Sequence, residues 1–422
     1  MCTLDNIKID MKKTPFLMML LGLVLGLTKA HAEVDPNFHI YLCFGQSNME
    51  GNTQWEAIDN AYVDPRFQML STDNFNSPKR VVGEWYTALC PIVHTKGKLG
   101  PTDYFGRTMV AALPTNHKVG VIAVALCGCP IEVFDKDLYK QLMANNADAY
   151  WCKLAKNHYN SNPYGRMVDM AKKAQQVGVI SGILLHQGCG NLGDPKWPSM
   201  VNKVYNDLLT DLGLKATDVP LFVGEVLYED MGGVCAAHNP VIAQVPSVIP
   251  TAHVVSAENI PGKDSYHFNA AGYRTLGRRY AAEVLKVMGR NVRKDAAYTL
   301  PNNLKIFFTP KSLEHSVVTN ADGTSAYKLW CTFEDGHKED VTSETTFTIT
   351  NQNITAKWTD FLGTTHTENI AIEGNSSDIQ SINGKNGPKG IANQTIRNLA
   401  GQRVGRDYKG IVIINGKTTV QK

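Results

Sequence analysis

Short apolar runs alternate with helix-like segments between residues 33 and 290, and this alternation limits the fold more than any other feature of the chain. Near-continuous apolar runs occupy residues 39–44, 119–125, 180–185 and 219–223. Such runs are typical of parallel strands that are covered on both faces. Strand, helix and strand in this order predict an α/β fold built on a doubly wound parallel sheet.

The segments between these runs carry apolar residues at helical spacing. One such set is Tyr164, Met167, Ala171 and Ala174, and another is Val201, Val204, Leu208 and Leu212. Asn269 is suited to cap a further helix whose Tyr273, Leu276, Tyr280 and Val284 share a face. Ligands of doubly wound sheets collect at the carboxyl ends of the strands. The candidate site residues that fall just after predicted strands are Ser47, Gly128, Gln187 and the pair Asp264 and His267.

The first apolar run is broken by Gly45, and Ser47 follows at once. A rigid strand fixes the position of such a serine, and a glycine removes the Cβ that would block an approaching substrate. The turn also leaves backbone N–H groups free to bind a developing oxyanion. Taken alone, however, a serine in this setting is more often an ordinary strand-end or helix-capping residue.

Asp264 and His267 lie three residues apart on a loop that precedes a predicted helix. A serine hydroxyl needs a general base, because it is a poor nucleophile at neutral pH. The base in turn needs a carboxylate that holds its tautomer and stabilises the imidazolium. This loop can supply both groups. The alternative interpretation of the pair is a surface turn at a helix start.

These segments resemble the sequence blocks of the SGNH hydrolases, in the branch of sialate O-acetylesterases and acetyl xylan esterases. Residues 45–51 resemble the first block, residues 185–188 the third and residues 264–268 the last. The surrounding sequence, from about 37 to 290, is similar to secreted acetyl xylan esterase-like proteins of gut Bacteroidetes. The resemblance implies an SGNH, flavodoxin-like fold.

The resemblance also implies roles for individual residues. Ser47 would attack an ester carbonyl, His267 would take its proton, and Asp264 would orient His267. The expected oxyanion donors are the backbone N–H groups of Ser47 and Gly128 and the side chain of Gln187. The residues expected to contact substrate are Gln46, Asn48 and Glu225, although Glu225 is equally suited to a hydrogen-bonded place at the sheet edge. No metal or other cofactor is expected, because the oxyanion hole supplies the electrophilic stabilisation.

Cys189 and four histidines lie outside this scheme. The branch usually has an acidic residue after the Gln-Gly of its third block, and Cys189 stands there instead. We interpret Cys189 as a neutral replacement rather than a second nucleophile, because a reactive thiol needs its own base. Four histidines have no evident carboxylate partner in the sequence, so we expect them to be structural or surface residues. They are His94, His158, His186 and His238.

The N-terminus has the form of a secretory signal peptide over residues 1–32. Basic residues follow Met11, residues 16–27 are apolar, and residues 30–32 have the small-x-small form of a cleavage site. We therefore expect export to the periplasm, the cell surface or the medium. The net charge of +3 is too small to indicate a nucleic-acid partner. Eight of the nine cysteines follow the leader at irregular spacings, which do not indicate a zinc site or one disulfide pairing.

The composition changes after residue 290. Residues 300–375 are rich in Thr, Phe, Val and Ile in short alternating runs, which predicts a small all-β module that resembles immunoglobulin-like repeats. Residues 376–393 have the composition of a flexible linker. Residues 394–422 resemble the C-terminal sorting tails of exported Bacteroidetes proteins, which would contact the cell envelope or secretion machinery. The alternative for this tail is a last β-hairpin of the module.

The sequence as a whole predicts a signal peptide, an esterase domain at residues 33–290, a β module, a linker and a C-terminal tail. The expected function is an exported serine esterase that removes O-acetyl groups from plant polysaccharide, with acetylated xylan as substrate and an acyl-enzyme as intermediate. Sialate O-acetyl esters are the rival substrate. A non-catalytic glycan-binding protein on an esterase fold is the rival class, and Cys189 is the one feature that favours it.

Overall fold

The computed structural model describes residues 33–57, 59 and 63–290, followed by shorter stretches. These stretches are 297–299, 305–307, 310–319, 325–333, 338–342, 345–350, 353–360, 365–371, 380–381, 396–398, 410–414 and 417–421. The predicted signal peptide lies outside the described residues. No helix within the described ranges is both long enough and apolar enough to cross a membrane.

A seven-stranded sheet forms the centre of the N-terminal region, with the order β5-β2-β6-β1-β7-β8-β9. Its strands are β1 (Phe38–Gly45), β2 (Phe67–Leu70), β5 (Trp85–Thr87), β6 (Lys118–Ala125), β7 (Val179–His186), β8 (Leu221–Gly224) and β9 (Ala252–Val255). All neighbours pair in parallel except β5, which runs antiparallel to β2 at the edge. A separate hairpin joins β3 (Phe75–Asn76) and β4 (Lys79–Arg80).

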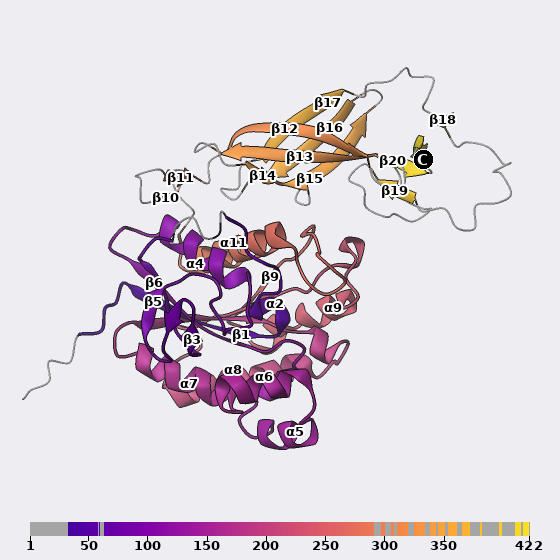
Figure 1. Cartoon of the computed structure of the whole chain (residues 1–422). Helices are drawn as coiled ribbons and strands as arrows, with labels where there is room; N and C mark the ends of the chain where they lie inside the picture. Colours follow the sequence, from indigo (N-terminus) through magenta and orange to yellow (C-terminus); the bar gives the residue numbers. More distant parts are fainter. Residues whose placement is uncertain are drawn as a thin grey trace, which may run out of the picture.

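Helices cover both faces of this sheet (Figure 1). One face packs against α4 (Pro101–Ala112) and α11 (Ala270–Val287), and the other against α6 (Tyr150–Tyr159), α7 (Pro163–Ala174) and α8 (Trp197–Leu212). The shorter elements are α2 (Ser47–Glu50), η1 (Ile131–Phe134), α5 (Tyr139–Asn145), η2 (Cys189–Asn191), η3 (Glu229–Met231), η4 (Ala236–His238), α9 (Asn239–Ile242) and α10 (Val245–Val248). Each face of the sheet therefore has its own hydrophobic core.

The doubly wound α/β fold predicted from the sequence is confirmed. When β5 and β2 at one side of the sheet are set aside, the order β6-β1-β7-β8-β9 places the first strand between the second and the third, as in flavodoxin-like sheets. The order reverses at β1, which is flanked by β6 and β7. The carboxyl end of β1 therefore lies at a topological switch point, where doubly wound folds bind ligands.

The C-terminal part is a separate all-β region, as predicted. One sheet contains β12 (Pro310–Thr319), β13 (Ser325–Phe333) and β14 (Lys338–Asp340), and another contains β15 (Thr345–Thr350), β16 (Asn353–Thr359) and β17 (Thr365–Ala371). Side chains of both sheets, among them Leu329, Phe333 and Trp358, form one core. The immunoglobulin-like assignment and the domain boundaries remain predictions.

Two small sheets complete the described strands. The first pairs β10 (Ala297–Thr299) with β11 (Lys305–Phe307). The second has the order β18-β21-β20-β19, from Gln380–Ser381, Lys417–Gln421, Gly410–Ile414 and Ile396–Asn398. Part of the predicted linker therefore pairs with the predicted tail, and β20 and β21 form a hairpin in a sheet separate from those of β12 to β17. The assignment of the tail remains a prediction. Most of the linker lies outside the described residues.

Candidate active site

The turn that carries Ser47 follows β1 and depends on a glycine. Gly45 has φ +150°, and a Cβ at this position would lie 2.2 Å from the carbonyl oxygen of His186 on the neighbouring strand. Only glycine allows the two strand ends to approach this closely. Ser47 is the first residue of α2 and is 4% exposed. Its position is thus set by the sheet and not by a mobile loop.

The structure brings Ser47, His267 and Asp264 together. The Ser47 Oγ atom lies 3.0 Å from His267 Nε2, and His267 Nδ1 lies 2.9 Å from Asp264 Oδ1. An ionised carboxylate only accepts hydrogen bonds, so Nδ1 carries the proton and Nε2 accepts from the serine hydroxyl. This arrangement can pass a proton from Ser47 to the imidazole while the carboxylate holds the tautomer.

Asp264 organises the loop that carries the imidazole. Its Oδ1 atom also accepts hydrogen bonds from the backbone N–H groups of Tyr266 and His267, both at 2.9 Å. Burial acts to raise the pKa of Asp264, but the hydrogen bonds from His267 and Tyr266 outweigh it and hold the pKa below its ordinary value. Asp264 is therefore ionised at neutral pH, as an orienting carboxylate must be.

Asn48 connects the nucleophile turn to the same loop. Its Nδ2 group donates to the carbonyl oxygen of Tyr266 at 2.9 Å, and its Oδ1 accepts from the hydroxyl of Tyr273 at 2.8 Å. Asn48 is 1% exposed. The sequence placed Asn48 among the substrate contacts, but its side chain is directed into the protein and fixes the distance between Ser47 and the base.

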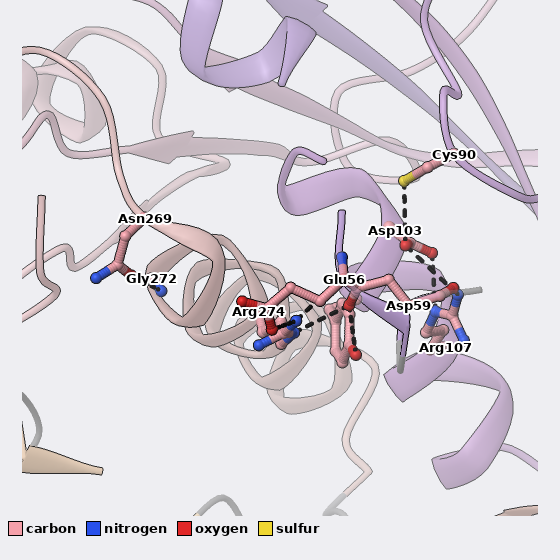
Figure 2. A network of polar contacts seen from close by, with 9 residues as sticks. Glu56, Asp59, Cys90, Asp103, Arg107, Asn269, Gly272 and Arg274 are labelled. Atoms are coloured by element: carbon pink, nitrogen blue, oxygen red, sulfur yellow. Dashed lines mark hydrogen bonds and ion pairs between the residues drawn. The ribbon is translucent and has the colours of Figure 1, made fainter. Parts of the chain in front are cut away.

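A buried ion-pair network anchors α11, which begins three residues after His267 (Figure 2). Asp59 is fully buried, and its carboxylate oxygens each accept a hydrogen bond from Arg274 at 2.9 Å. Arg274 also donates to Glu56 at 2.6 Å. The predicted cap is confirmed, because Asn269 Oδ1 accepts from the N–H of Gly272. The ion pair and the cap together hold the start of α11 in place. They also hold residues 263–268, the loop that carries Asp264 and His267 and is called the base loop below.

Two backbone N–H groups are suited to bind an oxyanion. Ser47 N lies in the first turn of α2, and the structure gives Ser47 N and Gly128 N no acceptor among the described residues. Gly128 has φ +78°, and a Cβ there would have no neighbour within 4 Å, so the space beside it is open. The N–H groups of Ser47 and Gly128 are therefore available to a ligand, and their role as oxyanion donors stays a prediction.

The Gln187 side chain is not presented to Ser47 as a donor. Its amide nitrogen donates to the carbonyl oxygen of Cys129 at 3.2 Å and to Asn191 Oδ1 at 2.8 Å, which engages both hydrogens. Its Oε1 accepts from the indole N–H of Trp197. This corrects the expectation of an oxyanion donor, because a fully buried amide with all hydrogens engaged braces the surrounding loops instead.

The other two expected substrate contacts are also engaged internally. Gln46 is 4% exposed, and its Oε1 accepts from the N–H groups of Gly188 at 3.1 Å and Gly190 at 3.0 Å. Glu225 accepts from the Tyr228 hydroxyl at 2.8 Å and from the N–H of Ala257 at 3.1 Å. Gln46 thus holds the loop after β7, and Glu225 takes the sheet-edge place that was its alternative.

Sequence reasoning missed two residues at the site, Glu50 and Cys127. The Glu50 carboxylate is 5% exposed and accepts a hydrogen bond from the N–H of Cys127. The Cys127 thiol interacts with the Ser47 hydroxyl, and burial together with the Glu50 charge raises its pKa to about 11. Cys127 is therefore a neutral thiol beside the nucleophile. The Cys127 side chain is partly exposed.

Two of the histidines have the carboxylate neighbours that the sequence did not reveal. His158 Nδ1 lies 2.8 Å from Asp73, and its ring stacks on His94 with a centroid distance of 4.4 Å. His94 Nε2 lies 3.7 Å from Glu50. The partners come from distant segments, so spacing along the chain could not show them. His94 thus lies against Glu50, and His158 stacks on the ring of His94. Both contacts suit the predicted structural role.

An acidic cluster lies outside this constellation. Asp135, Asp137 and Asp207 have carboxylate oxygens close enough to share a cation. The Lys203 ammonium already contacts all three, at 3.0, 2.7 and 2.8 Å respectively. The Lys203 ammonium therefore occupies the position between the three carboxylates, and Ser47 has no part in this cluster.

A hydroxyl, an imidazole and a carboxylate lie in hydrogen-bonded order at the switch point of a doubly wound sheet, an arrangement suited to a hydrolase that transfers acyl groups. Residues 37–286 match the family described as "Carbohydrate esterase, sialic acid-specific acetylesterase". The chain belongs to this family, whose members are O-acetyl carbohydrate esterases. The predicted resemblance to this branch of hydrolases is thereby confirmed.

Several solved structures are similar to the chain at low identity. A protein from Arabidopsis thaliana has 18% identity and a TM-score of 0.45, over 60% of this chain and 99% of that one. NanS has 14% identity and a TM-score of 0.46, over 61% and 99%. A carbohydrate acetylesterase from Xanthomonas citri has 15% identity and a TM-score of 0.41, over 74% and 70%.

Proposed function

We propose that the protein is an exported serine esterase that removes O-acetyl groups from plant polysaccharide, with acetylated xylan as its substrate. The observation that carries the serine mechanism is the 3.0 Å contact between Ser47 Oγ and His267 Nε2. The family match supports O-acetyl carbohydrate ester hydrolysis. The resemblance to secreted acetyl xylan esterase-like proteins supports xylan, and the form of residues 1–32 supports export.

The reaction proceeds in two halves. Ser47 Oγ attacks the acetyl carbonyl carbon while its proton passes to His267 Nε2. The negative charge that develops on the carbonyl oxygen is bound by the N–H groups of Ser47 and Gly128, and each such donor typically contributes about 10²–10³ in rate. The tetrahedral intermediate then collapses, and His267 gives the proton to the departing sugar oxygen. Water repeats these steps on the acyl-enzyme and releases acetate.

The decisive experiment compares wild type, Ser47→Ala and a control in a different serine. Acetate release from acetylated xylan is measured for each, with Ser265→Ala as the control because Ser265 lies on the base loop outside the relay. We expect Ser47→Ala to lose several orders of magnitude in kcat and Ser265→Ala to stay close to wild type. Xylan binding without acetate release above background by either protein would favour the non-catalytic glycan-binding alternative, and equal acetate release by both would remove Ser47 from the mechanism.

One observation favours the sialate alternative. The Lys263 ammonium lies on the base loop, where it bonds to the backbone and side-chain oxygens of Asn52 at 2.6 and 2.7 Å, and it lies 3.6 Å from Asp264. A cation here could attract the carboxylate of a sialic acid. The two substrates are separated by kcat/KM on acetylated xylo-oligosaccharide and on O-acetylated sialic acid, for wild type and Lys263→Gln. A sialate preference that disappears in Lys263→Gln would overturn the xylan assignment.

A further inference from the structure

Two thiols face each other beside the site, and the reaction scheme uses neither of them. Cys189 lies in η2, directly after the β7 loop that Gln46 holds, and Cys235 precedes η4. The two thiols interact, and this interaction lowers the pKa of Cys235 and, together with burial, raises that of Cys189. Cys235 is 3% exposed, whereas Cys189 is partly exposed. Cys189 is also the residue that departs from the family pattern.

The backbone around the two thiols is packed so that they remain close. The N–H of Gly193 donates to His238 Nδ1 at 3.1 Å. A Cβ at Gly188 would lie 2.6 Å from His238 Cδ2, so the loop after β7 rests directly on the segment that contains Cys235. The proximity of Cys189 and Cys235 is therefore built into the packing of two loops and does not depend on one rotamer.

The same two loops border the catalytic residues. The loop after β7 is bonded to Gln46, the neighbour of Ser47, through the N–H groups of Gly188 and Gly190. The segment before Cys235 is bonded to the base loop, because Val234 N donates to the carbonyl oxygen of Ser265 at 3.0 Å. A covalent link between Cys189 and Cys235 would thus join the surroundings of the nucleophile to those of the base.

We propose that Cys189 and Cys235 form a dithiol site that small disulfide oxidants convert to an intramolecular disulfide. Cys189 reacts first because it is the more exposed thiol: it loses its proton, its sulfur bonds to one oxidant sulfur, and the other leaves as a free thiol. Cys235 then loses its proton and attacks the Cys189 sulfur, which releases the second oxidant thiol. One protein dithiol and one oxidant disulfide become one protein disulfide and two thiols.

Other thiols serve as internal comparisons. Cys152 is partly exposed but donates to the carbonyl oxygen of Met143, and it has no second sulfur as a partner in the described residues. Cys127 is partly exposed, and its thiol interacts with the Ser47 hydroxyl. Neither thiol is therefore expected to react under conditions that convert Cys189 and Cys235.

The test uses the full chain incubated with oxidised glutathione or with dithiothreitol. Remaining thiols are alkylated, and tryptic peptides are mapped by mass spectrometry. We expect oxidation to remove two alkylation sites, to produce one linked peptide pair containing Cys189 and Cys235, and to raise the Tm by about 5–10 °C. Cys189→Ser and Cys235→Ser should each abolish the link and the Tm shift, whereas Cys152→Ser should retain both.

Two results would overturn the proposal. The first is equal alkylation of Cys189, Cys235 and Cys152 after oxidation of the wild-type protein. The second is a linked peptide that joins Cys127 to another cysteine in place of this pair. Both readouts are covalent and need no substrate. An inactive protein that still forms the link would contradict the proposed esterase function and leave this inference standing.

Discussion

The buried carboxylate of Glu50 accepts a hydrogen bond from the backbone N–H of Cys127, the residue before Gly128. Glu50 is the last residue of α2, the helix that begins with Ser47. This hydrogen bond therefore connects α2 to the loop after β6. The N–H groups of Ser47 and Gly128, which are proposed to bind the oxyanion, belong to the two segments that this hydrogen bond connects. Glu50 therefore sets the distance between them.

Replacing Glu50 with Gln should lower kcat by about 10–100-fold, because a charge-assisted hydrogen bond of roughly 1.5–3 kcal/mol then no longer positions Gly128. KM should change less, since the oxyanion forms only in the transition state. Steady-state kinetics on a soluble acetyl ester measure both. Glu84→Gln is the matched control, because Glu84 forms an exposed pair with Lys173. An unchanged kcat in Glu50→Gln would show that the loop is held by other contacts.

Asp264→Asn should leave the fold intact and lower kcat by about 10⁴-fold, because an amide at this position favours the wrong tautomer of His267. The pKa of Asp264 is held below its ordinary value, so the carboxylate is ionised over the whole range of a neutral assay. Circular dichroism establishes the fold of the variant, and kcat is measured at pH 7. A loss of less than tenfold would mean that a second group orients the imidazole.

His186 should make stability depend on pH. It is fully buried, its Nε2 has no partner among the described residues, and burial lowers its pKa to about 3. Below its ordinary pKa of about 6.5 the unfolded chain binds a proton that the folded chain does not, so stability falls as the pH drops from 6.5 toward 3. The contribution reaches at most about 1.4 kcal/mol per pH unit.

Urea unfolding between pH 6 and pH 4.5 tests this contribution. His186→Phe removes the titrating group, so its free energy of unfolding should vary less steeply with pH than that of the wild-type protein. The comparison uses the slope with pH rather than the absolute stability, because the new ring also changes packing. Equal slopes for the two proteins would assign the pH dependence to other groups.

Asp59→Asn should destabilise the fold by about 3–5 kcal/mol, because Arg274 would then be a buried cation without its main partner. Urea unfolding measures the loss, and the exposed pair of Glu84 and Lys173 supplies the control, where Glu84→Ala should cost less than about 1 kcal/mol. Since the network anchors α11, kcat should also fall. A loss below 1 kcal/mol would mean that Glu56 alone satisfies Arg274.

The sequence indicated the elements whose signals are local. Periodic apolar residues located β6, β7, α7 and α8, and Asn269 was identified as a cap because capping needs only neighbours along the chain. The pair Asp264 and His267 was recognisable for the same reason. His267 lies 220 residues from Ser47 along the chain. Their proximity could be predicted because both residues follow strands, and parallel strands end at the same edge of the sheet.

The roles of the buried amides could not be predicted in this way. Gln46, Asn48 and Gln187 have residue types that suit substrate contacts, and each of them has a backbone group of another loop among its actual partners. Those partners carry no side-chain signal in the sequence. The same holds for Glu50, whose partner is a backbone N–H, and for Cys189, whose partner Cys235 belongs to the loop after the next strand.

Asp264 Oδ1 accepts from two backbone N–H groups and from the imidazole of a residue only three positions away. The base and its orienting group are consequently preassembled by one short turn before any ester arrives. An enzyme built in this way spends no binding energy on aligning its own proton acceptor. Acetyl esters of different sugars should then differ mainly in how well they dock, and far less in how fast the docked ester is cleaved.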